Sequence, residues 1–233
     1  MNQRGSMNRK FNLGLSALTI GLVLASGSVM AYEKGDFVVR GGLAMVDPND
    51  DSSELSLNGT GLADTSVSVD DDTQLGLTLT YMFMDKVGVT LLGATPFKHT
   101  VTAKGVTADD LKTAEVKHLP PTVTVQYFPL DAQSAFQPYV GVGLNYTKFF
   151  QEELTSDFKD VLGDGKIKLD DSFGYALQLG ADYKLSSNIV LNAAIWSIDI
   201  DTTATIDLDS GSQIKTDVDI DPMVYMVGVG YQF

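Results

Sequence analysis

Apolar side chains recur at every second position along most of this chain, and this alternation constrains the fold more than any other feature. In residues 74–83 every odd position is apolar: Leu75, Leu77, Leu79, Tyr81 and Phe83. The same period of two runs through residues 172–183 and 223–233. Because successive side chains of a β-strand point to opposite faces, each segment is expected to be a strand with one apolar face.

Eight segments of this kind predict eight strands, at residues 37–46, 73–83, 87–97, 116–128, 136–150, 172–183, 189–200 and 220–233. Three of the connections between them are short and four are long, and the two kinds alternate along the chain. This layout is typical of an outer-membrane barrel with both termini in the periplasm. We therefore predict an all-β fold: an eight-stranded antiparallel transmembrane β-barrel with short periplasmic turns and long extracellular loops.

Charge is sorted between the predicted strands and the long connections. Counted with the flanking Asp199 and Asp221, the four long connections carry 25 acids and 7 bases, whereas the rest of the chain after residue 31 carries 5 acids and 6 bases. A lipid-facing wall requires this, because a Lys or Arg at the bilayer midplane costs about 2–4 kcal/mol. The strands of a soluble secreted β-sandwich would also alternate apolar and polar residues, but such a fold would not need charge sorted into the long connections.

Aromatic residues at the predicted periplasmic ends are expected to form an interfacial girdle: Phe37, Tyr81, Phe83, Tyr127, Tyr139, Tyr183, Tyr231 and Phe233.

Residues 1–31 have the layout of a secretory signal peptide. Basic residues precede an apolar stretch at 13–25, and Val29 and Ala31 supply small side chains before a cleavage site at Tyr32. The alternative is a membrane anchor, but the apolar stretch is shorter than the roughly 20 residues that a spanning helix needs. Met7 opens an equally good signal. We assign residues 1–31 to the signal peptide and 32–233 to the barrel.

Composition excludes several classes of function. The chain has no cysteine, which rules out a disulfide scaffold, a Cys-ligated metal site and a thiol enzyme. Its formal net charge of −14 argues against a nucleic-acid partner, which would require clustered bases. No catalytic triad or carboxylate pair can be argued from the spacing, so we expect no enzyme and no cofactor.

Two sequence patterns resemble metal-binding sites too weakly for either to be assigned. Asp160, Asp164 and Asp171 fit three positions of a calcium loop, but Leu162 occupies a ligand position and a short Asp replaces the usual Glu. His99 and His118 lie near opposite ends of one long connection and would supply only half of a metal site. We therefore predict no metal.

Several stretches of the chain resemble the outer membrane protein W family. They are residues 73–78, 91–97, 118–122, 138–147, 196–201 and 208–233. The resemblance implies an eight-stranded barrel with a narrow lumen that helps small hydrophobic molecules cross the outer membrane. It matches Leu92 and Trp196 to residues that narrow a hydrophobic passage, and the terminal Phe233 to a signal read by the barrel-insertion machinery. The expected partners are that machinery, outer-membrane lipid, lipopolysaccharide and small hydrophobic solutes.

Strand parity predicts which side chains face the lumen. On two of the strands the inward set includes Thr90, Leu92, Ala94 and Pro96, and Asn192, Ala194, Trp196 and Ile198. An eight-stranded barrel has room only for side chains or one small ligand, so we expect no open aqueous pore. We predict that Leu92 and Trp196 form an apolar constriction, the alternative being that they only plug the core. The lower lumen is expected to be polar near Arg40, Gln178 and Asp182.

Three prolines indicate an exit from the lumen. Proline cannot donate to the hydrogen-bond ladder of a sheet. Pro96, Pro120 and Pro121 fall at a similar height on the seam between the third and fourth predicted strands. This placement predicts a lateral gap through which an apolar solute leaves toward lipid, and a harmless bulge is the alternative.

Two classes of function remain compatible with the sequence. The apolar lumen residues favour a passive conduit for small hydrophobic molecules. The long acidic loops would suit a plugged anchor barrel that acts as a receptor or adhesin.

Overall fold

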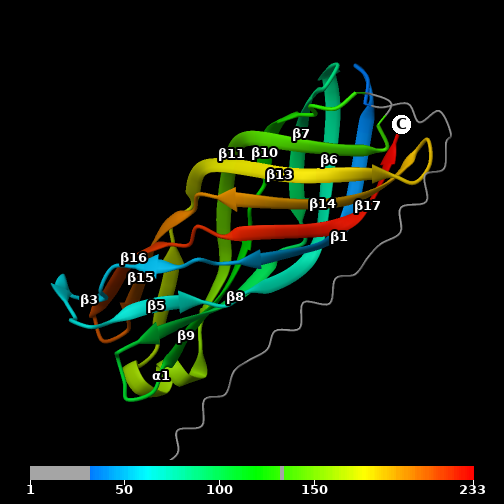
Figure 1. The fold of residues 1–233 in the computed structure, drawn as a ribbon. Helices are drawn as coiled ribbons and strands as arrows, with labels where there is room; N and C mark the ends of the chain where they lie inside the picture. The colour runs from blue at the N-terminus through cyan, green and yellow to red at the C-terminus, as the bar shows by residue number, and fades with distance from the viewer. Residues whose placement is uncertain (1–31, 132–133) are drawn as a thin grey trace, which may run out of the picture.

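The computed structural model describes residues 32–131 and 134–233, which form an almost entirely β structure (Figure 1). The predicted signal peptide at 1–31 lies outside the described residues. Within the described ranges, no helix is long and apolar enough to cross a membrane.

Eight antiparallel strands close into a barrel. They are β1 (Phe37–Asp47), β6 (Asp72–Met84), β7 (Val87–Ala94), β10 (Thr122–Tyr127), β11 (Phe136–Leu154), β13 (Ser172–Lys184), β14 (Ile189–Ile198) and β17 (Met223–Gln232). The order around the wall is β10-β7-β6-β1-β17-β14-β13-β11, and β11 pairs with β10 to complete the circle. The predicted fold class is confirmed.

The outer wall of the barrel is apolar, as the alternation requires. On β6, Leu75, Leu77 and Leu79 are exposed, whereas Thr78 and Thr80 are buried in the lumen. Most of the predicted aromatic girdle is also exposed, but the assignment of Tyr139 to it is wrong, because this side chain is 2% exposed and lies in the lumen. The parity of β11 explains the correction, since the register that turns Val140 outward turns Tyr139 inward.

The long connections fold into further structure instead of remaining irregular loops. They contain β2 (Asp51–Ser52), β3 (Ser56–Leu57), β4 (Thr60–Gly61), β5 (Ser66–Val69), β8 (Phe97–Lys104), β9 (Leu111–Leu119), α1 (Ser156–Leu162), β12 (Gly165–Leu169), β15 (Asp201–Leu208) and β16 (Gln213–Asp219). These elements form a lobe at the end of the barrel away from the C-terminus (Figure 1). Their inward faces bury a second apolar cluster that includes Leu55, Phe158 and Ile206, which explains why acidic segments fold there at all.

The third and fourth predicted strands are not continuous. The third breaks between β7 and β8, at Thr95 and Pro96, and the fourth breaks between β9 and β10, at Pro120 and Pro121. The prolines remove ladder donors at both points, so each predicted strand becomes two.

Candidate functional site

A buried ion pair closes the lumen near the short turns. The Arg40 guanidinium donates from Nε to Asp182 Oδ1 at 3.0 Å and from Nη2 to Asp182 Oδ2 at 2.5 Å. Tyr32 Oη and Asn192 Nδ2 donate to the same carboxylate at 2.5 and 2.8 Å. Both charged groups are buried, so the pair depends on these added hydrogen bonds to offset the cost of desolvation.

Further polar side chains fill the lumen around this pair. Gln178 Oε1 accepts hydrogen bonds from Thr124 Oγ1 and Gln126 Nε2, both at 2.9 Å. The Tyr139 ring lies against Gly180, where a Cβ atom would approach it to 2.4 Å. Arg40, Gln178 and Asp182, predicted to line a polar lower lumen, therefore lie in a packed polar layer, which we call the floor.

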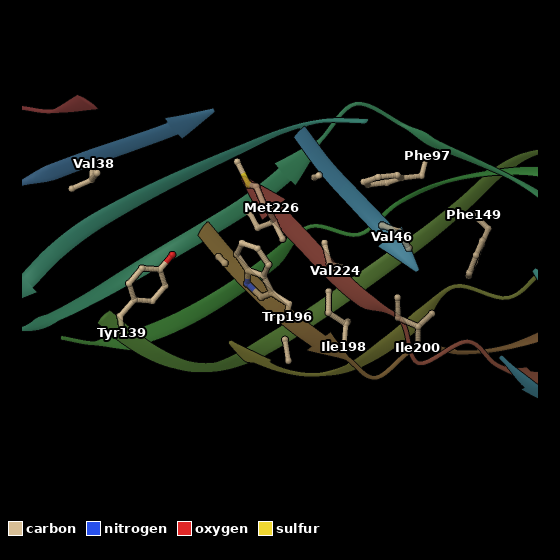
Figure 2. Close-up of a cluster of buried hydrophobic side chains, with 14 of the residues drawn as sticks. Val38, Val46, Phe97, Tyr139, Phe149, Trp196, Ile198, Ile200, Val224 and Met226 are labelled. Atoms are coloured by element: carbon tan, nitrogen blue, oxygen red, sulfur yellow. The ribbon is translucent and has the colours of Figure 1, made fainter. Parts of the chain in front are cut away.

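Above the floor the lumen becomes apolar. Trp196 is buried in one cluster with Ile198, Val224 and Met226 (Figure 2). Leu92 belongs to the same cluster. Leu92 is on β7 and Trp196 is on β14, four strands away in the ring of eight, so they project from opposite walls. The indole Nε1 of Trp196 has no hydrogen-bond partner among residues 32–131 and 134–233. The two predicted constriction residues thus belong to one buried apolar cluster and lie on opposite walls of the lumen.

Three apolar cavities lead from the barrel into the lobe. The inner cavity is lined by residues that include Val46, Phe149 and Ile200. The middle cavity shares Val69 and Leu169 with the inner one. The outer cavity shares residues such as Leu55, Ala103 and Ile206 with the middle one. Shared walls make the three cavities neighbours in one apolar series.

The barrel wall is interrupted beside the inner cavity. The ladder between β7 and β10 ends at the Leu92–Thr122 pair, and the ladder between β8 and β9 begins at the Phe97–His118 pair. Residues 93–96 and 119–121 therefore face each other across a seam without ladder pairing. The structure brings the three predicted prolines together here.

One expectation for the seam is wrong. Parity placed Pro96 in the lumen, but its side chain is exposed, because the chain leaves the regular strand at Ala94. Pro121 is also exposed, whereas Pro120 is buried.

Two histidines that are well separated in the chain meet at the inner cavity. His99 Nε2 and His118 Nε2 are 2.9 Å apart, and both side chains line that cavity. Each histidine faces inward because it lies two positions after a buried apolar residue of its strand, Phe97 or Val116. The register that pairs β8 with β9 is a property of the tertiary structure and could not be read from this local pattern.

A cluster of carboxylates lies on the surface of the lobe, at the end nearest the barrel. Carboxylate oxygens of Asp199, Asp201 and Asp221 lie within 4.8 Å of one another, and none of the three residues is buried. Partial burial and the neighbouring carboxylates raise the pKa of Asp201. In the unassigned calcium-like pattern, Asp164 pairs with Lys159 and Asp171 accepts a hydrogen bond from Tyr146.

The C-terminus closes the wall at the short-turn end. The Phe233 backbone N–H donates to the Phe37 carbonyl at 2.9 Å, and the ring contacts Tyr231 edge-on. Its side chain is exposed on the outer surface, beside the other aromatic residues of this end.

Comparison with known proteins identifies the same fold and sequence pattern elsewhere. Residues 33–233 match the model of the OmpW family. The chain is 44% identical to outer membrane protein W of Vibrio cholerae, over 94% of this chain and 98% of that protein. It is 42% identical to outer membrane protein W of Escherichia coli, over 95% and 99%. The crystal structure of OprG from Pseudomonas aeruginosa is 50% identical and superposes with a TM-score of 0.84, covering 88% of this chain and 99% of that one.

Proposed function

This chain belongs to the OmpW family of bacterial outer-membrane β-barrels, and from that premise we propose that it is a passive conduit for small hydrophobic molecules. The observation that carries the proposal is the series of three apolar cavities, whose inner member is lined by Val46, Phe149 and Ile200 of the same buried cluster as Leu92 and Trp196. An apolar solute is stabilised there by about 25 cal/mol for each Å² of surface removed from water. Water and ions gain nothing comparable, because the cavity walls are apolar.

The exit of the solute is lateral in this proposal. Passage straight through the barrel would require an apolar molecule to displace the Arg40–Asp182 pair and its hydrogen bonds. The seam between residues 93–96 and 119–121 lies beside the inner cavity, in a wall whose outer face is apolar. We infer that the solute enters from the lobe and leaves through this seam into lipid.

The orientation of the barrel follows the same reasoning. The lobe faces the outside and the short turns face the periplasm, which puts both termini on the periplasmic side. The exposed terminal ring of Phe233 then serves as the signal for the insertion machinery.

Trp196 provides the test, because it is the single tryptophan of the chain. A brominated alkane that reaches the constriction quenches indole fluorescence, so we expect saturable quenching in protein reconstituted into phospholipid vesicles. Replacing Leu92 and Trp196 together by Asn should lower uptake of an apolar solute about tenfold while the barrel stays folded.

Uptake that is unchanged in the double variant would contradict the role of Leu92 and Trp196 in the passage. Uptake by the unmodified protein no higher than that of empty vesicles would contradict the conduit and favour a plugged anchor whose lobe is the functional part.

A further inference from the structure

The inner cavity contains a pair of histidines with an unusual arrangement of hydrogen bonds. His99 Nδ1 lies 2.5 Å from the backbone carbonyl of Asp70, and His99 Nε2 lies 2.9 Å from His118 Nε2. His118 Nδ1 is buried and finds no partner in the part of the chain that the structure describes. The His118 ring stacks on Phe97 and lies tilted against Phe149, at centroid distances of 5.5 and 5.9 Å.

These contacts determine where the protons are. A carbonyl oxygen only accepts hydrogen bonds, so His99 Nδ1 carries a proton and donates it to Asp70. In neutral His99 the Nε2 atom is then an acceptor, and His118 Nε2 must supply the proton between the two rings. His118 Nδ1 then carries no proton, and its lone pair requires a hydrogen-bond donor.

The surroundings keep His118 neutral. Apart from the two histidines, the inner cavity is lined by valine, leucine, isoleucine, proline and phenylalanine side chains. Burial and the nearby His99 lower the pKa of His118 to about 3, against a smaller opposite effect of the Asp72 carboxylate. The other charged group facing the pair is Asp70, whose Oδ1 lies 3.8 Å from His99 Nδ1. The His118 ring is therefore uncharged at neutral pH.

We propose that the inner cavity is a recognition site for amphiphilic solutes with one hydroxyl head, which donates its proton to His118 Nδ1 while the tail lies in the apolar cavities. This inference rests on the proposed conduit and narrows its solutes, since a medium-chain alkanol satisfies the orphan acceptor and an alkane does not. The head is then held beside the seam, next to the pair of Phe97 and His118 at which the ladder resumes. The tail extends into the middle cavity.

Nitrogen NMR of the unmodified protein tests the site directly. With ¹⁵N-labelled histidine in lipid bilayers, octanol should shift the resonance of the unprotonated His118 Nδ1 to lower frequency, and octane should leave it in place. Equal effects of octanol and octane would overturn the proposal. So would a resonance that already has its hydrogen-bonded position before any solute is added, because a water molecule would then satisfy the atom.

Transport by a matched variant gives an independent test. Replacing His99 and His118 together by Phe keeps two stacked aromatic rings and removes every imidazole nitrogen from the cavity. We expect the ratio of octanol to octane uptake to fall roughly three- to tenfold, the usual worth of one hydrogen bond. An unchanged ratio with both solutes still transported would reject the histidine site and leave the conduit standing. Failure of the unmodified protein to transport either solute would reject the conduit itself.

Discussion

Arg40 and Asp182 are 142 positions apart in the chain, yet they form a two-point ion pair in the floor of the lumen, with Nε–Oδ1 at 3.0 Å. They come from β1 and β13, which are separated by β17 and β14 in the barrel wall. The pair therefore ties one side of the lumen to another. Both side chains are buried, so loss of one partner would leave the other charge uncompensated.

Replacing Asp182 by Asn should destabilise the barrel by about 3–5 kcal/mol, because the Arg40 charge stays buried without its partner. Urea unfolding in phospholipid vesicles measures the change. Asp131→Asn is the matched control, since it breaks the exposed pair with Lys86, whose Nζ–Oδ1 distance is 3.3 Å. The control should cost about 0–1 kcal/mol. Equal losses in the two variants would mean that the floor pair has no special role.

Cross-linking the seam should stop transport. With Thr95 and Pro121 both replaced by Cys, a short bismaleimide joins the two sides, and uptake of an apolar solute should fall to the level of empty vesicles. The chain has no native cysteine, so the reaction is specific.

The control for the seam is a cross-link at an intact part of the ladder. Val89 and Val125 are register partners on β7 and β10. The same reagent on the Val89→Cys/Val125→Cys protein should leave uptake unchanged. Full transport by the cross-linked seam would argue against lateral exit.

Gly180→Ala should disturb the floor, because the new Cβ would lie 2.4 Å from the Tyr139 ring. Overpacking of this kind costs about 1–3 kcal/mol. Gly93→Ala is the control, since a Cβ there meets no atom within 4 Å. We expect urea midpoints to fall for the first variant alone, and a normal midpoint for Gly180→Ala would show that Tyr139 can move freely.

Acid should weaken the barrel near the histidine pair. Burial and His99 hold the folded-state pKa of His118 near 3, below the value of about 6.5 in an unfolded chain. Between these two pH values the unfolded state binds a proton at His118 and the folded state does not. The free energy of unfolding therefore falls as the pH falls, by at most about 1.4 kcal/mol per pH unit.

Urea unfolding at pH 7 and pH 5 checks this effect. The chain contains two histidines, so the His99→Phe/His118→Phe protein has no group of this type left. Its stability should change much less between the two pH values. The same pH dependence in both proteins would assign the effect to other groups.

The period of two in the sequence by itself determined the wall of this protein. Leu75, Leu77 and Leu79 face outward because a strand has only two faces, and this is a local property of the chain. The same rule put Leu92, Trp196 and Arg40 in the lumen. Parity alone also puts Tyr139 there, and the error at this position came from the tendency of aromatic residues to lie at interfaces.

Tertiary structure alone decided which side chains meet. The contacts of Arg40 with Asp182 and of His99 with His118 depend on register and on how the ring of strands closes, and these join residues far apart in the chain. The lobe likewise folds because its apolar faces, around Ile206 and Phe158, bury one another across segments that look acidic in isolation. The face that a side chain occupies is encoded locally by its position in the strand, whereas the residues that it contacts depend on the closed geometry of the whole barrel.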